Sequence, residues 1–459
     1  MMKPFTLAEI AAACGGQYVG SDELKGSVIT SVERDSRAVK EGSLFLAIKG
    51  ERVDGHDFIE KCFDSGAACA ICERAPQNPS KPYILVDSTL AAVKKAAKAY
   101  REKFDIPVVG VSGSVGKTST KEMLYAVLSQ KYRTHKTQGN LNNELGVPLT
   151  ILAMPEDTQA AVIEMGISGF GEMTRLSEVA QPTICVLTII GCCHLENLGD
   201  RDGVLRAKTE MFSFAREGAD YVLNGDDDKL SAVREVKGKR PLFFGLDPKN
   251  DYHAEDIENN GEGGVSCKLC FGDTKLGVTI PAIGSYMVSN ALAAVAVGRL
   301  LGLSDDELKN GVESYKTVGS RANVINTGKI RIIDDCYNAN PTSVKASLET
   351  LKNFRGRTVA ILGDMKELGA DELRLHYETG ALARELGIDV VLAAGPLAKE
   401  LAGGADGKWF PTKEELINAL PGIIREGDTV LVKASHSMQF EKIVEYLNRK
   451  EAQKCQYHI

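Results

Sequence analysis

The first 88 residues alternate short apolar runs with polar turns, a pattern that predicts a small domain of short strands and helices. The run "KPYILVDS" at 81–88 has the β-branched and aromatic residues typical of a strand and closes this segment. Residues 89–104 then repeat apolar positions at helical spacing and lead into Pro107. We therefore expect a first domain at 1–88 and a second domain that begins with this helix.

The segment from 89 to 322 has the pattern of a parallel sheet covered by helices, because apolar runs rich in Val and Ile are separated by helical segments. These runs are "VVGVSG" (108–113), "AAVIEMG" (160–166) and "TICVLTII" (183–190). The polar, Gly-rich stretch 249–264 is expected to form a loop ahead of strands around 265–281, and helix returns at 286–302.

The segment 323–459 repeats the alternation of strand and helix and predicts a doubly wound, Rossmann-like domain. Its strand candidates are "KIRIIDDCYN" (329–338), "TVAILGDM" (358–365), "DVVLAAG" (389–395) and "DTVLVKAS" (428–435). The expected fold class is thus α/β with three domains, in which the central domain carries a parallel sheet.

Composition narrows the function classes. The chain has 459 residues, 43% apolar and 25% charged, which is typical of globular domains, and its net charge of −7 comes without any block of Lys and Arg. Nucleic acid is therefore not an expected partner. The N-terminus lacks the pattern of a signal peptide, and the most apolar later stretch is interrupted by Arg299. Eleven cysteines without a regular framework indicate free thiols in a reducing cytoplasm. We also expect a monomer without membrane insertion.

The stretch "VVGVSGSVGKTSTKEM" at 108–123 predicts a phosphate-binding loop, although the strict pattern G-x-x-x-x-G-K-[ST] requires glycine where this chain has Val111. A strand, a Gly-rich turn and a helix N-terminus surround an anion with backbone N–H groups. Lys117 would meet the β- and γ-phosphates, and the Thr118 hydroxyl would bind Mg²⁺. The alternative is a chance Gly-rich turn. The expected ATP-binding residues of the loop are Gly113, Ser114, Val115, Gly116, Lys117, Thr118 and Ser119.

The shifted glycine, Gly110, gives the loop another known form. "GVSGSVGKTS" resembles the G-x-[TS]-G-[TS]-x-G-K-[TS] loop of the Mur ligases, ATP-dependent amide-forming enzymes of peptidoglycan synthesis. The resemblance covers nearly the whole chain, and "YNANP" and "GDMKELG" are similar to the MurF type, which adds D-alanyl-D-alanine to a UDP-N-acetylmuramoyl-tripeptide. Further matching segments are "DSRAVKEGSLFLAIKGERVDGHDFI", "TQGNLNNELGVPLTIL", "IEMG" and "HLENLGDRDGVLRAKTEMF".

This resemblance implies that the N-terminal domain binds the UDP sugar, the central domain binds ATP and the C-terminal domain closes over the site. ATP would phosphorylate the substrate carboxylate, and the amine of the dipeptide would attack the acyl phosphate, with two Mg²⁺ ions as cofactors. Glu164 ends an apolar strand, where hard oxygen ligands suit Mg²⁺. The resemblance makes His194 a ligand of the second ion and Lys208 a carbamylated, metal-facing lysine. The expected catalytic residues are Lys117, His194 and Lys208.

The resemblance also implies substrate contacts. The bound ATP would be contacted by Asn290, Arg321 and Asp335. Substrate contacts are expected at Ser36 and Arg37 for the uridine diphosphate, at Asn140, Asn142 and Asn143 in a substrate loop, and at Asn338 and Asn340 for the dipeptide or tripeptide. Two positions depart from the family pattern: Met287 replaces an Asn, and His436 replaces an Arg beside the matching Lys433 and Ser435.

Other interpretations remain. A folylpolyglutamate synthetase shares the central and C-terminal domains but lacks the first, and a nucleotide-gated regulatory protein would show little turnover. The C-x-x-C pairs Cys69/Cys72 and Cys267/Cys270 are too far apart for a zinc ribbon and are expected to be plain thiols. The acidic run 224–228 is expected to be a solvated turn. The third residue of the tripeptide, a diamino acid such as meso-diaminopimelate or lysine, is left open.

Overall fold

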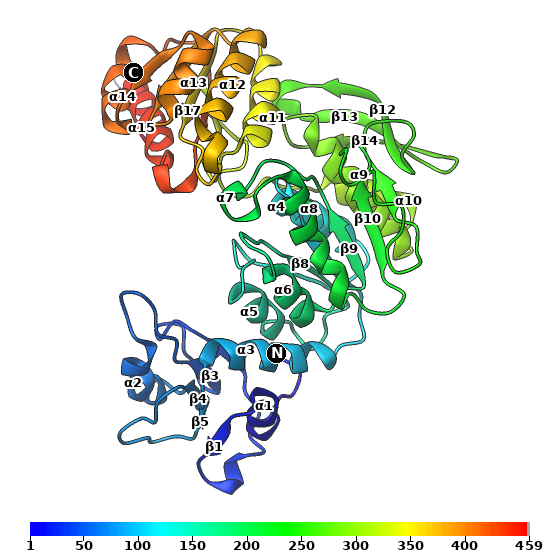
Figure 1. The fold of residues 1–459 in the computed structure, drawn as a ribbon, viewed down its shortest axis with the longest axis vertical. Coiled ribbons are helices and arrows are strands. Elements are labelled where there is room, and N and C mark those ends of the chain that lie inside the picture. The colour runs from blue at the N-terminus through cyan, green and yellow to red at the C-terminus, as the bar shows by residue number, and fades with distance from the viewer. Residues whose placement is uncertain (457–459) are drawn as a thin grey trace.

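The computed structural model describes residues 1–456 and, within them, three β-sheets. Figure 1 shows the N-terminal part in blue at one end, the central part in cyan and green, and the C-terminal part in yellow to red at the other end. The sheets lie within residues 17–85, 108–280 and 323–433. The fold is the expected three-domain α/β arrangement, while the domain boundaries at 88 and 322 stay a prediction. Among residues 1–456 no helix combines the length and the apolar character needed to cross a membrane.

The N-terminal sheet has the strand order β1-β5-β4-β3-β2, and only the β1–β5 pair is antiparallel. The elements are α1 (Leu7–Cys14), β1 (Gln17–Val19), β2 (Ser31–Glu33), β3 (Ser43–Leu46), α2 (Ile59–Asp64), β4 (Cys69–Cys72) and β5 (Tyr83–Leu85). Thr6 and Glu9 form a capping box that fixes the start of α1. The core of this domain continues through the next helix into one face of the central sheet.

The central sheet has the order β14-β13-β12-β11-β10-β9-β6-β8-β7 and is parallel from β7 to β12. Its parallel strands include β6 (Val108–Ser112), β7 (Thr134–Lys136), β8 (Ala160–Glu164), β9 (Ile184–Leu187), β10 (Asp220–Asn224) and β11 (Leu242–Phe244). Strand β6 lies between β8 and β9, and on its two sides the chain adds strands toward opposite edges of the sheet. In open parallel sheets ligands bind beyond the carboxyl ends of the strands at such a switch point.

The polar stretch expected to loop out is instead largely strand. Strand β12 (Tyr252–Asn259) pairs with β13 (Val265–Phe271), which pairs with β14 (Thr274–Ile280), both antiparallel. Tyr252 and Ala254 are buried in the core, whereas Asp256, Glu258 and Asn259 are exposed. The prediction was wrong because one exposed face and a bulge between Glu255 and Glu258 made the strand resemble a polar loop.

Helices cover both faces of the central sheet. They are α3 (Thr89–Glu102), α4 (Lys117–Leu128), α5 (Gly146–Leu152), α6 (Glu172–Ala180), α7 (Leu195–Leu198), α8 (Arg201–Thr209), α9 (Tyr286–Leu300) and α10 (Asp305–Glu313). Helix α9 is buried along most of its length and shares one apolar core with α4. Because both faces of the sheet are covered at its centre, strands β6, β8 and β9 are buried along their whole length, as the sequence indicated.

The C-terminal sheet has the order β15-β16-β20-β17-β18-β19, with only β15 antiparallel. Its strands are β15 (Asn323–Asn326), β16 (Arg331–Asp334), β17 (Thr358–Gly363), β18 (Val390–Ala394), β19 (Lys408–Phe410) and β20 (Thr429–Lys433). Its helices are α11 (Pro341–Lys352), α12 (Glu372–Glu385), α13 (Ala398–Ala405), α14 (Lys413–Ala419) and α15 (Glu441–Gln456). The four expected strands form the centre of the sheet, and the two that sequence analysis missed are the edges. Residues 457–459 of the expected domain lie outside the described residues.

Short 3₁₀ helices complete the chain. They are η1 (Asp22–Leu24), η2 (Gly55–Phe58), η3 (Glu210–Phe214), η4 (Gly261–Gly263), η5 (Gly369–Asp371), η6 (Leu420–Gly422) and η7 (His436–Met438). Figure 1 shows α7 at the edge of the central domain that faces the C-terminal domain. There, Gly369 at the start of η5 approaches the backbone of Leu195 and Glu196 in α7. The central and C-terminal domains therefore touch beside the carboxyl ends of the central strands.

Candidate active site

The Gly-rich loop joins β6 to α4 as the sequence predicted. Gly113 has φ 151° and Gly116 has φ 85°, both in the region that favours glycine. A β-carbon on Gly113 would also overlap Thr188 Oγ1. Val111, which occupies the glycine position of the strict pattern, is buried within β6 and takes no part in the turn. The loop is thus intact with valine there.

The two residues that begin α4 point into the site. Lys117 Nζ donates to the Gly113 carbonyl at 2.8 Å, and burial lowers the pKa of this lysine. The Thr118 hydroxyl donates to the Glu164 carboxylate, with both oxygens 3.0 Å away. Glu164 lies at the end of β8, and Asn142 Nδ2 donates to its Oε1 at 2.8 Å. Hydroxyl, carboxylate and amide oxygens are ligands that suit Mg²⁺, so this group fits the ion.

A second group lies where β9 ends. His194 has φ 53° and precedes α7, and its Nδ1 lies 2.5 Å from Glu367 Oε2 in the C-terminal domain, an ion-pair distance without hydrogen-bond geometry. Burial lowers the pKa of His194, while Glu367 raises it and the charges of Lys208 and Lys117 lower it further. Cys193 Sγ lies 3.0 Å from Ser114 Oγ, which ties this segment to the Gly-rich loop.

Lys208, on α8, is almost fully buried, with 1% of its surface exposed. Burial lowers its pKa to about 8, and the charge of Lys117 acts in the same direction. Lys208 does not line the cavity described below. Burial therefore disfavours the ammonium form of this lysine, which lies near His194.

A cavity of about 460 Å³ extends from the Gly-rich loop to the C-terminal domain. On its C-terminal side, the Arg321 guanidinium stacks on Tyr337 with its Cζ 3.8 Å from the ring centroid. Asp335 accepts from Lys433 Nζ at 2.6 Å and from Ser347 Oγ at 2.7 Å. The expected site residues that line the cavity are Ser114, Val115, Gly116, Lys117, Thr118, Ser119, Asn142, Asn143, Glu164, His194, Asn290, Arg321, Asp335, Asn338 and Asn340.

Three of these asparagines also have structural partners. Asn290 Oδ1 accepts from Thr120 Oγ1 at 3.0 Å, and its Nδ2 lies 3.3 Å from the sulfur of Met287, the residue that departs from the family pattern. Asn340 Oδ1 caps α11 by accepting from the Ser343 N–H. Asn143 Oδ1 accepts backbone N–H groups at the start of α5. These side chains keep only part of their hydrogen-bonding capacity for a ligand.

Other expected residues do not line this cavity. Gly113 and Lys208 are buried but are not among its lining residues, and Asn140 is exposed on the loop outside it. Arg37, in the N-terminal domain beside Ser36, is exposed and pairs with Asp35 at 2.7 Å. The uridine diphosphate contacts remain a prediction that concerns a separate part of the molecule.

Sequence analysis missed several residues at the site, among them Lys121, Thr188, Tyr337 and Glu367. Lys121 follows Lys117 by one helical turn, and this i, i+4 spacing places both on one side of α4. Tyr337 is part of "YNANP", and Glu367 is part of "GDMKELG", so both were inside quoted motifs. Their roles depend on contacts between domains, which the order of residues does not reveal.

The acidic run 224–228 is not simply a solvated turn, and that prediction was wrong for Asp227. Its carboxylate is buried and accepts from the N–H groups of Ile190, Lys229 and Leu230. These bonds anchor the segment that leads to His194. The run was misread because its carboxylates, although polar, satisfy backbone donors inside the fold.

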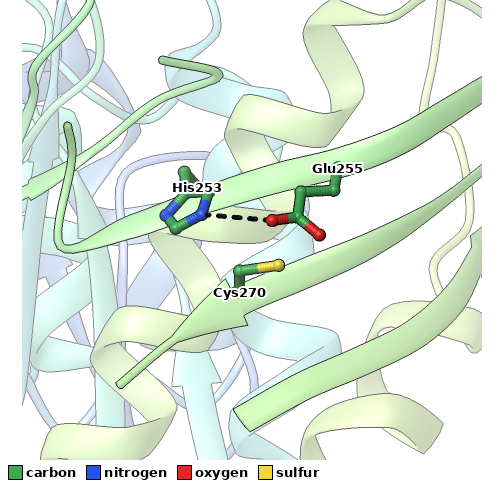
Figure 2. A group of neighbouring side chains, drawn as sticks. All are labelled: His253, Glu255 and Cys270. Carbon is green, nitrogen blue, oxygen red and sulfur yellow. Dashed lines mark ion pairs between the residues drawn. The ribbon is translucent and has the colours of Figure 1, made fainter. Parts of the chain in front are cut away.

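The C-x-x-C cysteines are buried free thiols, as expected. Cys270 faces His253 and Glu255 on the neighbouring strand, and one potential ligand atom from each lies within 4.8 Å of the others (Figure 2). Glu255 Oε2, however, accepts from Lys275 Nζ at 2.6 Å, so the carboxylate is already neutralised by a cation. The ammonium group argues against a metal ion at this place.

The sheet switch point, the Gly-rich loop and the cavity closed by a second α/β domain define a multidomain enzyme that uses a nucleoside triphosphate. Three sequence families match in order: "Mur ligase family, catalytic domain" at 28–114, "Mur ligase middle domain" at 111–298 and "Mur ligase, glutamate ligase domain" at 320–436. The chain belongs to the Mur ligase family, and within it to the MurF type.

Individual relatives and solved structures support this assignment. The UDP-N-acetylmuramoyl-tripeptide--D-alanyl-D-alanine ligase of Bacillus subtilis is 37% identical over 96% of this chain and 98% of its own length. The MurF crystal structure from Acinetobacter baumannii matches with a TM-score of 0.90 at 33% identity, covering 98% of this chain and 99% of that one. MurF from Thermotoga maritima, solved in complex with ADP, matches with a TM-score of 0.82 at 33% identity, covering 92% and 98%.

Proposed function

We propose that this chain joins D-alanyl-D-alanine to UDP-N-acetylmuramoyl-tripeptide and converts ATP to ADP and phosphate. The product is UDP-N-acetylmuramoyl-pentapeptide, a precursor of peptidoglycan. The observation that carries the proposal is the single cavity in which the Gly-rich loop and Glu164 face Arg321 and Asp335 of the following segment. The curated relatives, matched over nearly their full length, bear the name of this activity.

The reaction proceeds through an acyl phosphate. The tripeptide carboxylate attacks the γ-phosphorus of ATP, and the bond from that phosphorus to the ADP oxygen breaks. The amine of the dipeptide then attacks the acyl carbon, phosphate leaves, and the amine loses a proton. Developing negative charge on phosphoryl and acyl oxygens requires fixed cations and N–H donors. Lys117 and the backbone of residues 113–119 supply these groups beside the cavity.

Bound Mg²⁺ would neutralise charge on the phosphate oxygens. Thr118 and Glu164 would hold one ion, since their oxygen atoms converge at 3.0 Å. His194, in the segment between β9 and α7, would bind a second ion. On the nucleotide, Asn290, Arg321 and Asp335 would meet the base and ribose, as the family resemblance implies.

Lys208 would be carbamylated. Its buried amine, with a pKa near 8, has the neutral fraction needed for its nitrogen to bond the carbon of CO₂ with release of a proton. The resulting anion would lie near Lys117, whose charge disfavours a positive charge at this position. Carbamylation thus relieves the electrostatic cost of burying an ammonium group.

The remaining substrate contacts follow the domains 1–88, 89–322 and 323–459. Ser36 and Arg37 would bind the uridine diphosphate, and the loop with Asn140, Asn142 and Asn143 would bind the sugar or peptide. Asn338 and Asn340 would meet the incoming dipeptide. The enzyme would act as a monomer in the cytoplasm.

Phosphate release from Mg-ATP tests this function. Release is expected only when both UDP-N-acetylmuramoyl-tripeptide and D-alanyl-D-alanine are present. Release without the UDP sugar would favour a folylpolyglutamate-type ligase, and absence of release with intact nucleotide binding would favour a regulatory module. Lys117→Met should abolish release, because it removes the cation that faces the phosphates.

A further inference from the structure

A lysine that the proposed chemistry does not use is buried directly behind the site. The side chain of Lys121, on α4, is 1% exposed and does not line the cavity. Its Nζ lies 3.4 Å from Glu164 Oε2 and 3.3 Å from Glu122 Oε1. It also donates to the Gly139 carbonyl at 3.4 Å. Lys121 therefore contacts a candidate metal ligand and a candidate substrate loop at once.

The charges around Lys121 balance within a closed network. Lys121 lies between Glu164 and Glu122, and Glu122 also pairs with Lys136, whose ammonium group packs on the Tyr125 ring. The two ammonium groups thus balance the charges of the two carboxylates. A buried carboxylate that loses its cation is strongly disfavoured, so Glu164 would have to move or find another partner if Lys121 were neutral.

The loop that Lys121 contacts through Gly139 is also bound to the Glu164 carboxylate. Gly139 lies three residues before Asn142, whose amide donates to Glu164 Oε1 at 2.8 Å, and the Asn142 carbonyl accepts from the Gly166 N–H. The loop is therefore tied to Glu164 directly through Asn142 and indirectly through Lys121. Both ties depend on one position of the carboxylate.

We propose that Lys121 is a positioning residue that holds Glu164 and the loop 138–143 as one unit, so that the metal-nucleotide and the tripeptide substrate are placed by the same buried cation. This inference rests on the proposed function. It predicts that loss of the cation weakens divalent-metal binding in the nucleotide complex and raises the KM for the UDP-tripeptide together. The KM for D-alanyl-D-alanine should stay unchanged, since its expected site is in the C-terminal domain.

The test compares Lys121→Met and Lys121→Gln with Lys131→Met in the full chain. Glutamine keeps a donor for the Gly139 carbonyl, so it serves if the methionine variant does not fold. Lys131 lies just beyond α4, and its Nζ donates to the Gly302 carbonyl away from the site, which makes it a matched lysine control. Free Mn²⁺ is titrated against each protein with excess ADP and followed by electron paramagnetic resonance, and thermal melting checks folding.

The expected result is Mn²⁺ binding weakened about 10-fold or more in both Lys121 variants, the range found when residues that orient metal ligands are removed. Lys131→Met should bind like the wild type. Unchanged Mn²⁺ affinity in a folded Lys121 variant, or a raised KM for D-alanyl-D-alanine alone, overturns the inference. If the wild type binds Mn²⁺-ADP but never forms the pentapeptide, the proposed function fails instead, and the Mn²⁺ comparison still decides the role of Lys121.

Discussion

His194 of the central domain and Glu367 of the C-terminal domain meet with 2.5 Å between Nδ1 and Oε2. Both residues have left-handed backbone, with φ 53° and 65°, which is uncommon for residues other than glycine. Gly369 approaches α7 beside them. A residue expected at the metal site is therefore in direct contact with the domain expected to close over it.

Glu367→Gln should weaken this contact between the domains, because it removes the charge opposite the His194 ring. We expect a lower kcat and a larger radius of gyration by small-angle X-ray scattering, since fewer molecules hold the two domains together. Glu385→Gln, at the far end of α12, is the control and should behave as the wild type. A variant with wild-type kcat and radius of gyration would show that the pair does not contribute to closure.

Gly113→Ala should impair nucleotide binding. The φ of 151° and the overlap with Thr188 Oγ1 impose about 1–3 kcal/mol of strain, equivalent to roughly 5- to 150-fold in affinity. Calorimetric titration with ADP measures the loss. Gly403→Ala, in α13 with no atom near the added carbon, is the control and should leave binding unchanged. Equal ADP affinity in the two variants would contradict the account of the loop.

Stability should fall on mild acidification. His376 is buried, its Nε2 accepts from the Met365 N–H at 2.9 Å, and burial lowers its pKa below 6.5. The unfolded chain therefore binds more protons than the folded one as the pH falls below 6.5. The contribution of His376 to the free energy of unfolding is complete above that pH and is lost as the pH falls. The pKa of His135 is lowered by burial in the same direction.

Urea unfolding at about pH 7.5 and about pH 5.5 measures this effect, because histidines titrate in that window. Glutamine can accept the Met365 N–H bond without titrating, so His376→Gln should reduce the pH dependence without removing it. An unchanged pH dependence in this variant would exclude His376 as a source.

Arg101→Met should destabilise the junction between α3 and α6. The buried guanidinium donates to the carbonyls of Ala180, Gln181 and Phe104, and burial lowers its pKa to about 9. Its loss leaves buried acceptors unpaired, at a cost of roughly 2–4 kcal/mol. Lys98 lies on the same helix as Arg101 and forms only a half-exposed ion pair, with Glu178 of α6. Lys98→Met should therefore lower the free energy of unfolding by less than about 1 kcal/mol. Equal unfolding free energies for the two variants would contradict this.

The strands that could be predicted from the sequence are those whose burial produces a continuous run of apolar residues. The apolar strands that end at Ser112 and Glu164 are buried on both faces, so their apolar runs were unambiguous. Strand β12 and the edge strands β15 and β19 were missed because they are short or half exposed, and their side chains look like those of loops.

The site was predictable where residues follow one another in the loop, and less so where distant segments meet. Lys117 and Thr118 were found from their spacing, whereas the Lys121–Glu164 and His194–Glu367 pairs join residues far apart in the chain. The metal ligands and Lys208 were expected from family resemblance, and the electrostatics of Lys208 now give a physical reason for that expectation.

Amide formation through an acyl phosphate leaves a signature in the phosphate product, which an isotope experiment detects. The terminal carboxylate of UDP-N-acetylmuramoyl-tripeptide is labelled with ¹⁸O and incubated with the enzyme, Mg-ATP and D-alanyl-D-alanine. Inorganic phosphate should carry one ¹⁸O atom for each pentapeptide formed, because the carboxylate oxygen leaves with the phosphoryl group. Unlabelled phosphate alongside pentapeptide would contradict it.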